Sequence, residues 1–475
     1  MAVNDILEIG RQGLNTSKQA LQTTSNNIAN ANTPGYSRRR AQIETNPMTF
    51  SGGQQLGGGV QVSKVMRVHD DFVQKQIVDE AQALGSLKMQ AEVMQRLEST
   101  VMRDGEHISE LVNKFFNDYR ELSSSPETAS LRTVVGSSAD ALGAGIRRMN
   151  DSFEGMKREL DLRIGDVTDQ INMTTREIAG LNNTIAESEA RGEVPNDLYD
   201  RRDSLVRNLS SKVDVAVTPD QRGQITVISG GAVLVQGTDT NELSVARTPE
   251  TEAKTPGQVD VYIKTAGGGE RPITRLIKQG ELGGMIRVRD EVIGQSQGQL
   301  DKIAYHIAKS VNGVHSKGVG VDGTSGRNMF KDLGDDAKGA AFRFGISEDV
   351  GKSFEGVAIG TSGAAGDNEI ALAIADLQNL KGLASTNVAD AGHTINESLN
   401  ALVGKIGVET QRDQSFFNHQ QSVVDQLENY RQSISGVSLE EEAVNMIQYQ
   451  TVFNASAKAM KVGSELFETI LSLKD

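Results

Sequence analysis

The amino-acid sequence predicts a mainly α-helical fold with an inserted β-rich domain, in which the terminal helices form a coiled coil and other long helices form a bundle. Three observations lead to this fold class. Apolar residues recur at every seventh position near both ends, helical periodicity fills long central stretches, and apolar-polar alternation is confined to residues 213–277. Because the alternating stretch lies between helical stretches, we expect domains that are discontinuous in sequence.

The first predicted helix carries an apolar row with a seven-residue step, which is typical of a coiled coil. Pro34 and Gly35 end this helix. The row consists of Leu7, Leu14, Leu21 and Ile28, and the small or polar residues Gly10, Ser17, Thr24 and Ala31 stand between its members. A single amphipathic helix gains little stability in water, so this one requires a partner.

Long helices are also expected in the middle of the chain. Residues 70–122 have a heptad row that is interrupted at Asp104-Gly105, and a second long helix covers residues 137–191. A capped helix starts at Asn196, and helical patterns return at 284–314 and 371–435. Together these segments predict a helical body of residues 37–211, 282–319 and 370–436.

Strands are predicted where apolar residues recur at every second position instead of at helical spacing. Val213 to Ile277 alternates apolar and polar residues between Gly, Pro, Asp and Asn turns, which is typical of an antiparallel sheet. Phe342–Phe344 and Val357–Ile359 also read as short strands, within a Gly-rich segment that either completes the β-rich domain or packs on the helices. We therefore expect a β-rich outer domain of residues 212–281 and 320–369.

The last predicted helix has a row that matches the first. Gly436 ends the preceding helix, and Ser438 with Glu441 forms a Ser-x-x-Glu capping box, so a hinge is expected at residues 435–438. The row consists of Leu439, Met446, Phe453, Met460 and Phe467, with Ala443, Ala457 and Leu471 four places after some of its members. Residues 1–36 and 437–475 are thus expected to pair as a terminal coiled coil, with the two rows as the subunit interface.

Composition restricts the possible chemistry of these 475 residues. The chain has no Cys and no Trp, so disulfides and thiolate metal centres are excluded. A net charge of -14 argues against nucleic acid and anionic membranes as partners. The sequence lacks a basic segment followed by an apolar run and any stretch of about 20 apolar residues, which predicts a soluble chain without a cleaved secretory signal.

No constellation of catalytic, cofactor-binding or metal-binding residues stands out, and we expect a protein that is not an enzyme. The basic run Arg38-Arg39-Arg40 is interpreted as a solvated or subunit-facing patch, and Asp200 and Asp203 as parts of surface ion pairs. Gly351-Lys352-Ser353 lacks the first glycine of a phosphate-binding loop. The six histidines are scattered without metal-ligand spacing.

Three segments carry a resemblance to a known family. The run from Leu21 to Ser37, with its asparagines and the Thr-Pro-Gly-Tyr end, resembles the N-terminal signature of the bacterial flagellar rod, hook and hook-associated proteins. The block from Asn196 to Asp214 is similar to a stretch of those members that join the hook to the filament. Residues 439–466 resemble the C-terminal segment of the same family.

This resemblance implies a structural role at the junction between hook and filament. It implies a ring of about eleven copies, with hook protein on one side, a second junction protein on the other, and a cytosolic export chaperone at the C-terminal helix. It also implies an extracellular location in the flagellum after export by the flagellar secretion apparatus. We further expect the terminal helices to become ordered on assembly. Another hook or rod component, or a secreted wall-active enzyme on a flagellar scaffold, are the alternatives.

Overall fold

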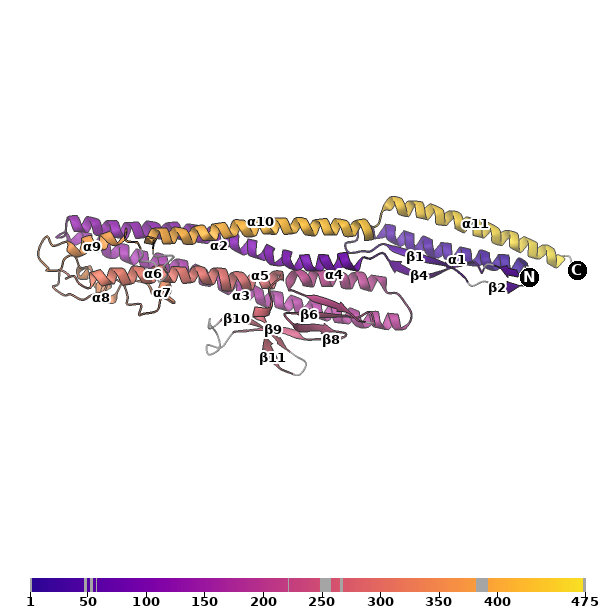
Figure 1. Cartoon of the computed structure of the whole chain (residues 1–475), viewed down its shortest axis with the longest axis horizontal. Coiled ribbons are helices and arrows are strands. Elements are labelled where there is room, and N and C mark those ends of the chain that lie inside the picture. Colours follow the sequence, from indigo (N-terminus) through magenta and orange to yellow (C-terminus); the bar gives the residue numbers. More distant parts are fainter. Residues whose placement is uncertain are drawn as a thin grey trace.

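The computed structural model shows an elongated molecule whose long helices run along its length, with both chain termini at one end (Figure 1). The structure describes residues 2–46, 49–51, 54–56, 58–220, 222–247, 258–264, 268–381 and 392–472.

Three long helices form the frame of the body. α2 (Asp71–Ser124) packs against both α3 (Ala129–Ala190) and α10 (Ile395–Ser435). The side chain of Asp70 caps the start of α2 by accepting hydrogen bonds from the backbone N–H groups of Phe72 and Val73. Contact with two neighbours explains why this helix is so long, because propensity alone would not sustain it.

The expected interruption of α2 at Asp104-Gly105 is wrong, because the helix continues through both residues. Each is buried for a reason that the sequence pattern does not reveal. The Asp104 carboxylate accepts a hydrogen bond of 3.1 Å from the Ser152 hydroxyl of α3. A Cβ atom on Gly105 would lie 2.7 Å from Cγ2 of Val403, so the glycine permits the close approach of α10.

Shorter helices complete the body. The helix expected at 284–314 is divided by a π-helical turn, and the one expected at 371–435 is two helices, between which residues 382–391 lie outside the described part. These elements are α4 (Asn196–Lys212), η1 (Thr274–Leu276), α5 (Gly280–Arg287), the π-helical η2 (Val288–Ile293), α6 (Gly294–His315), α7 (Ala340–Arg343), α8 (Glu348–Lys352), η3 (Phe354–Gly356) and α9 (Glu369–Leu377).

Two antiparallel sheets project from one side of the body, beside α3 and α5 (Figure 1). One has the order β5-β6-β7-β8 and the other β11-β10-β9. Their strands are β5 (Ala216–Pro219), β6 (Ile225–Ser229), β7 (Ala232–Gln236), β8 (Asp239–Thr240), β9 (Glu242–Arg247), β10 (Val259–Lys264) and β11 (Glu270–Pro272). Two asparagines of α3 hold them: Asn172 bonds both backbone groups of Leu243, and Asn182 those of Ile225.

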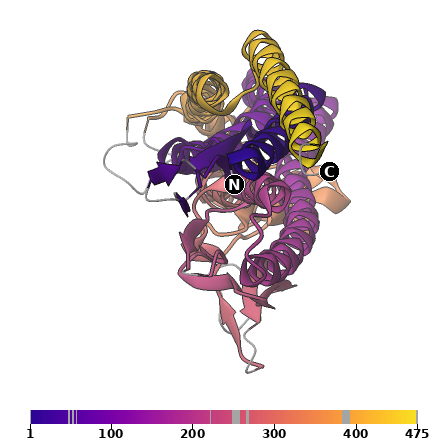
Figure 2. The same cartoon turned by 90° about the vertical axis from the view of Figure 1, so that its right-hand side faces the viewer.

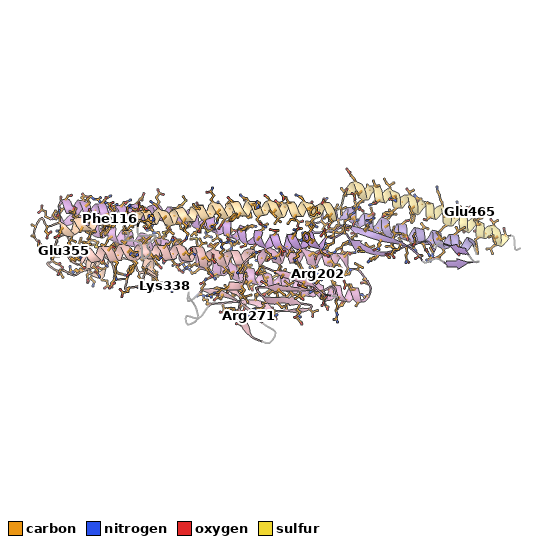
Figure 3. The ribbon with its side chains drawn as sticks, viewed as in Figure 1. Phe116, Arg202, Arg271, Lys338, Glu355 and Glu465 are labelled. Carbon is orange, nitrogen blue, oxygen red and sulfur yellow. The ribbon has the colours of Figure 1, made fainter. Side chains whose placement is uncertain are left out.

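Residues 320–369, which we grouped with the β-rich domain, lie elsewhere. They form loops and short helices beside α6 at the end of the body far from the chain termini, where Glu355 is seen in Figure 3. The strand expected at Phe342–Phe344 is wrong, since α7 occupies Ala340–Arg343, and no strand is assigned to Val357–Ile359. The Asp301 carboxylate fixes the turn of α7 by accepting the N–H groups of Gly339 and Ala341 at 2.8 and 2.9 Å.

The terminal region combines α1 (Ala2–Ala29), α11 (Leu439–Ser472) and a hairpin of β1 (Arg39–Thr45) and β4 (Val60–Arg67), with the short pair β2 (Thr49–Ser51) and β3 (Gln54–Leu56) at its tip. Figure 2 shows α1 and α11 side by side at this end. The hairpin belongs with α1 rather than with the body to which we assigned residues 37–69, because the Thr16 hydroxyl donates to the Val60 carbonyl at 3.0 Å.

The hydrophobic core coincides with the body. Buried apolar side chains form a continuous cluster from Val78 to Ile406, in which the ring of Phe115 contacts those of Phe116 and Phe330. Among the described residues before Val73 and after Ile406, Ala20 is the one hydrophobic residue that is fully buried. The molecule thus has a well-packed body and a terminal region without a core of its own.

Candidate assembly interface and its joint to the body

The terminal helices run antiparallel and approach most closely at small residues. A Cβ atom on Gly10 would lie 2.6 Å from Cγ of Met460, and one on Gly13 would lie 2.7 Å from Oγ of Ser456. On the other helix, a Cβ atom on Gly463 would lie 3.0 Å from Cδ2 of Leu7. Glycine therefore sets the spacing of the pair, because any larger residue at these positions would separate the helices.

The structure places the two predicted rows at the edges of this contact. Leu7, Leu14, Leu21 and Ile28 are half-buried, as are Met446, Phe453 and Met460, whereas Leu439 and Phe467 are 56% and 42% exposed. Leu7 and Met460 are the row members that lie against glycines of the opposite helix. The pairing of the two segments is observed in one chain, and the use of both rows between subunits stays a prediction.

The fully buried positions of α1 are small or polar rather than leucine. They are Gly10, Gly13, Thr16, Ser17, Ala20, Thr24 and Asn27. On α11 the second inward row is Glu442, Tyr449, Ser456 and Gly463, instead of Ala443, Ala457 and Leu471, which are exposed. The recurrence of small residues on both helices was the available sequence signal for this face.

A second apolar stripe on α11 is left exposed by the described part of the chain. Its large members recur at helical spacing on a face beside the one that contacts α1, and two alanines fill the gaps. The stripe consists of Val444, Val452, Ala455, Ala459, Val462, Leu466 and Ile470, all exposed to solvent. An uncovered apolar surface of this length indicates a binding surface.

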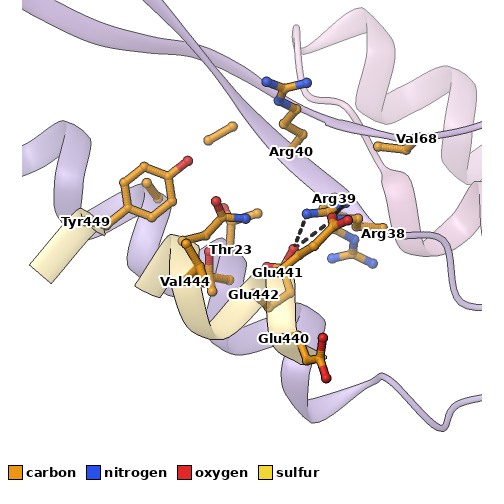
Figure 4. A pocket seen from close by; sticks show the side chains of 14 residues that line it. Thr23, Arg38, Arg39, Arg40, Val68, Glu440, Glu441, Glu442, Val444 and Tyr449 are labelled. Atoms are coloured by element: carbon orange, nitrogen blue, oxygen red, sulfur yellow. Dashed lines mark hydrogen bonds and ion pairs between the residues drawn. The ribbon is translucent and has the colours of Figure 1, made fainter. Parts of the chain in front are cut away.

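A pocket of about 600 Å³ opens where α1 and α11 diverge toward the body (Figure 4). Its walls carry the three arginines of residues 38–40 and the three glutamates of residues 440–442, together with Thr23 and Tyr449. Two of the arginines form ion pairs within the chain, Arg38 with Glu441 and Glu442, and Arg39 with Asp197. The basic run is therefore partly intramolecular rather than wholly solvated or subunit-facing.

Glu442 is the centre of this joint and is 2% exposed. Its carboxylate accepts hydrogen bonds from Nδ2 of Asn27 at 3.1 Å and from Nε of Arg38 at 2.8 Å. Burial alone would lower the pKa of Arg38, but the hydrogen bonds and charges of Glu441 and Glu442 outweigh it and raise that pKa. The guanidinium stays charged and binds the start of α11 to the hairpin.

The backbone of Arg38 connects the same point to the body, because its N–H donates to the Ser435 carbonyl at 2.8 Å. Ser435 ends α10, and α11 starts after residues 436–438. A Cβ atom on Gly436 would lie 2.2 Å from the Gln432 carbonyl oxygen, so glycine is required at this bend. Only half of the expected capping box forms: the Glu441 N–H donates to Oγ of Ser438 at 3.4 Å, while the Glu441 carboxylate binds Arg38.

A second group of ion pairs fixes the hairpin to α4. Nη1 of Arg67 lies 3.3 Å from the Asp200 carboxylate and 2.5 Å from that of Asp203. The ring of Tyr199 lies beneath the guanidinium groups of both Arg67 and Arg202, at 5.0 and 5.2 Å. Asp200 and Asp203 are thus engaged in ion pairing, as their alternation with arginine indicated, although Asp200 is buried rather than on the surface.

A third group fixes the end of α10. Glu428 lies 2.8 Å from Arg207 of α4 and 2.7 Å from Arg431 of its own helix. Burial would raise the pKa of Glu428, but the hydrogen bonds and charges of Arg431 and Arg207 outweigh it and lower that pKa. The joint between terminal region and body is therefore built from charged and polar groups.

Within the described residues, no group of three or more His, Asp or Glu side chains is arranged to hold a metal ion. None of the helices of that same part combines the length and apolar character needed to cross a membrane.

Comparison with known families agrees with the division into body and terminal region. The profile described as "Flagellar hook-associated protein FlgK helical domain" matches residues 94–330, which lie in the body and its sheets. "Flagella basal body rod protein" matches residues 7–36, and "Flagellar basal body rod FlgEFG protein C-terminal" matches residues 430–473. The two rod profiles thus coincide with the paired terminal helices.

Two relatives that align over nearly their full length, and one solved structure, show the same relationship. Flagellar hook-associated protein 1 of Bacillus subtilis is 28% identical over 98% of this chain and 97% of its own length, and that of Salmonella typhimurium is 26% identical over 99% and 100%. The flagellar hook junction protein FlgK from Burkholderia pseudomallei matches 76% of this chain and all of its own with a TM-score of 0.68 at 16% identity, which shows the shared fold. The chain belongs to the flagellar hook-associated protein 1 family.

Proposed function

We propose that this chain is a structural component of the flagellum at the junction between hook and filament, built into it through its terminal helices. The observation that carries the proposal is the uncovered apolar stripe of α11 on a helix pair without a core of its own. The names of the relatives, which are hook-associated and hook junction proteins, support the location.

The terminal pair is suited to folding that is completed on assembly. The α1 helix contributes small and polar residues to the pair, which bury little apolar area, and Thr23, Ser25 and Asn26 are weak helix formers. A surrounding layer of other copies would cover the α11 stripe and supply the missing burial. Amide exchange in the free chain tests this point: fast exchange at both ends is expected, and strong protection there would contradict it.

The proposed partners follow from the same surface. Copies of the chain form a ring of about eleven, with hook protein and a second junction protein on its two sides, and an export chaperone covers the C-terminal helix before assembly. In this arrangement residues 1–36 and 437–475 form the inner polymerisation domain. The helical body surrounds it, and the sheets beside α3 face outward.

The decisive experiment alters the α11 stripe without touching the contact with α1. In a strain that lacks the gene, the variant Val462→Glu/Leu466→Glu should give hooks without filaments in the electron microscope, because two charges would be buried between copies. The matched control Gln450→Glu/Asn454→Glu places the same charges on exposed polar positions of α11 and should restore filaments.

Export must be measured in the same cultures, because the substitutions would also affect the binding of an export chaperone to this helix. We expect the stripe variant in the culture medium in a soluble form, exported but not incorporated. Normal filaments with the stripe variant would refute assembly through this face. Retention of the variant inside the cell would assign the stripe to export instead.

A further inference from the structure

From Val408 to Tyr430, α10 carries a row of side chains that recur at helical spacing and are exposed, apart from the half-buried Val423. We call it the α10 ridge, and it consists of Val408, Arg412, Phe416, His419, Val423 and Tyr430. Val408, Phe416 and Tyr430 are 70%, 53% and 56% exposed. Two exposed aromatic rings on one helix face are unusual in a chain with 4% aromatic residues.

This ridge points away from the body. The face of α10 that packs on α2 carries the buried residues Ile406, Thr410 and Asp413. Its contacts include the Thr410 hydroxyl, which donates to the Met94 carbonyl at 3.3 Å, and the Gln420 amide, which donates to the Glu80 carbonyl at 3.2 Å. Because the ridge lies on the other side of the helix, α2 cannot cover it.

A second exposed row lies on α3. This α3 ridge consists of Leu162, Asp166, Asp169 and Met173, all exposed, with Leu162 at 73% and Met173 at 58%. It lies apart from the face of α3 that buries Ile164 and Ile171 in the core. At 1.5 Å per residue, Leu162 and Met173 are about 16 Å apart, and the α10 ridge is about 33 Å long.

The two ridges lie at the same level along the molecule, with α2 between their helices. Thr410 of α10 bonds Met94 of α2, and the neighbouring residues Glu92 and Arg96 of α2 pair with Arg163 and Glu159 of α3. One cross-section of the body therefore contains residue 410 of α10 and residues 159–163 of α3. Copies placed side by side would bring the two ridges together without a large axial shift.

The ionised members of the two ridges, Arg412 on one and two aspartates on the other, are of opposite charge. Arg412 and His419 stand between the apolar residues of the α10 ridge, and Asp166 and Asp169 between those of the α3 ridge. The guanidinium of Arg412 already contacts Asp413 and remains 45% exposed, so it can take a second acceptor. Apolar ends with complementary charges between them are the features of a specific protein contact.

We propose that the α10 ridge of one copy packs against the α3 ridge of the next copy, an inference that rests on the assembly proposed above. The contact joins two different surfaces, so successive copies can follow one another around an axis and close a ring. It gives the body its own lateral interface, distinct from that of the terminal helices.

The absence of cysteine from the chain allows a direct test. Leu162→Cys or Met173→Cys is combined with Val408→Cys or Phe416→Cys in one chain, and isolated hook-filament particles are oxidised and run on a denaturing gel. At least one of the four combinations should give a ladder of dimers and higher multiples, and the pair that reacts reports the axial shift between copies. The control Met102→Cys/Phe416→Cys uses an exposed residue of α2 and should stay monomeric.

Two results would overturn the inference. One is that double-cysteine chains are incorporated but remain monomeric in all four combinations. The other is that a single cysteine on either ridge gives dimers by itself, which would show that like surfaces meet. If the unmodified chain is absent from the particles, the proposed function has failed rather than the ridge contact.

A charge variant gives an independent readout. Phe416→Glu/Tyr430→Glu should lower incorporation about tenfold in competition with the unmodified chain, while the melting temperature of the purified protein stays the same because both rings are exposed. Unchanged incorporation of this variant would contradict the contact, and a lower melting temperature would show that the rings serve the fold of one chain.

Discussion

The body and the terminal region of this chain are both built from long helices, but different forces hold them. In the body, α2 and α3 bury large apolar side chains in a cluster that is continuous from Val78 to Ile406. In the terminal region, glycines and polar groups line the contact between α1 and α11, and the larger apolar residues are half-buried or exposed. The difference teaches that burial within one chain stabilises the body, and it is the reason why we propose that the terminal pair is stabilised by neighbouring copies.

The sharpest test of this comparison removes one aromatic ring from each region. Phe115→Ala should destabilise the body by about 3–5 kcal/mol, because the ring is fully buried against Phe116, Tyr119 and Phe330. Phe453→Ala should leave the unfolding transition of the free chain almost unchanged and lower incorporation into particles. Denaturant titration measures the first effect, and an equal loss of stability in both variants would break the comparison.

The next largest effect is expected at the joint. Glu442→Ala removes one of the two acceptors of the Asn27 amide and the acceptor of Nε of Arg38, which costs about 1–3 kcal/mol. In assembled particles this should speed amide exchange at the start of α11. The exposed Glu440→Ala serves as the matched control and should show no such change. Equal exchange in both variants would mean that Glu442 does not hold the joint.

A smaller effect concerns pH and is confined to the body. His315 is buried, and its ring bonds the Arg327 carbonyl at Nδ1 and the Ala358 N–H at Nε2, at 2.8 and 3.0 Å. Burial lowers the pKa of His315, so this side chain binds a proton more readily in the unfolded chain than in the folded one. The neutral, buried ring therefore contributes to the free energy of unfolding. This contribution is complete above pH 6.5, the ordinary pKa of histidine, and is lost as the pH falls below that value.

His315→Gln should remove this contribution to the pH slope of the melting temperature between pH 7.5 and pH 5. The corresponding slope of the free energy of unfolding cannot exceed about 1.4 kcal/mol per pH unit for one proton. Burial also lowers the pKa of His69 and His306, so some slope should remain in the variant. A slope that is identical in variant and unmodified chain would show that His315 is not linked to folding.

The smallest effect is expected from Gly13→Ala. The added methyl group would lie 2.7 Å from Oγ of Ser456, so the terminal helices must separate slightly. We expect a cost of about 1 kcal/mol, seen as a disadvantage in competition for incorporation. The double variant Gly13→Ala/Ser456→Gly restores the space and should recover most of the loss. No recovery would show that the close approach of the helices is unimportant.

The repeating patterns were sufficient to predict most helices, the sheets of residues 216–272 and the pairing of the two chain ends. They could not predict which faces of the terminal helices meet. A seven-residue apolar row is compatible with a partner on either side, and the choice depends on the shape of the other helix, here on Gly10 and Gly13 fitting Met460 and Ser456.

The joint and the distal loops had no comparable signal. Ion pairs such as that of Arg67 with Asp200 join residues far apart in sequence, and charged residues carry no period that reveals their partner. The sequence Phe342-Arg343-Phe344 alternates like a strand, but the backbone bonds from Gly339 and Ala341 to Asp301 impose a helical turn. Short apolar runs of this kind are ambiguous without tertiary contacts.

The polar character of the joint has a mechanical consequence. When one part of an elongated molecule tilts against another, a close-packed apolar contact between them must open a void. Even a displacement of a fraction of an ångström then costs free energy. The exposed carboxylates of Glu441 and Asp197, which pair with Arg38 and Arg39, can instead exchange their partner for water at little cost. We therefore expect the molecule to bend most easily between the end of α10 and the start of α11, so that an applied torque would move this joint before it strains the body.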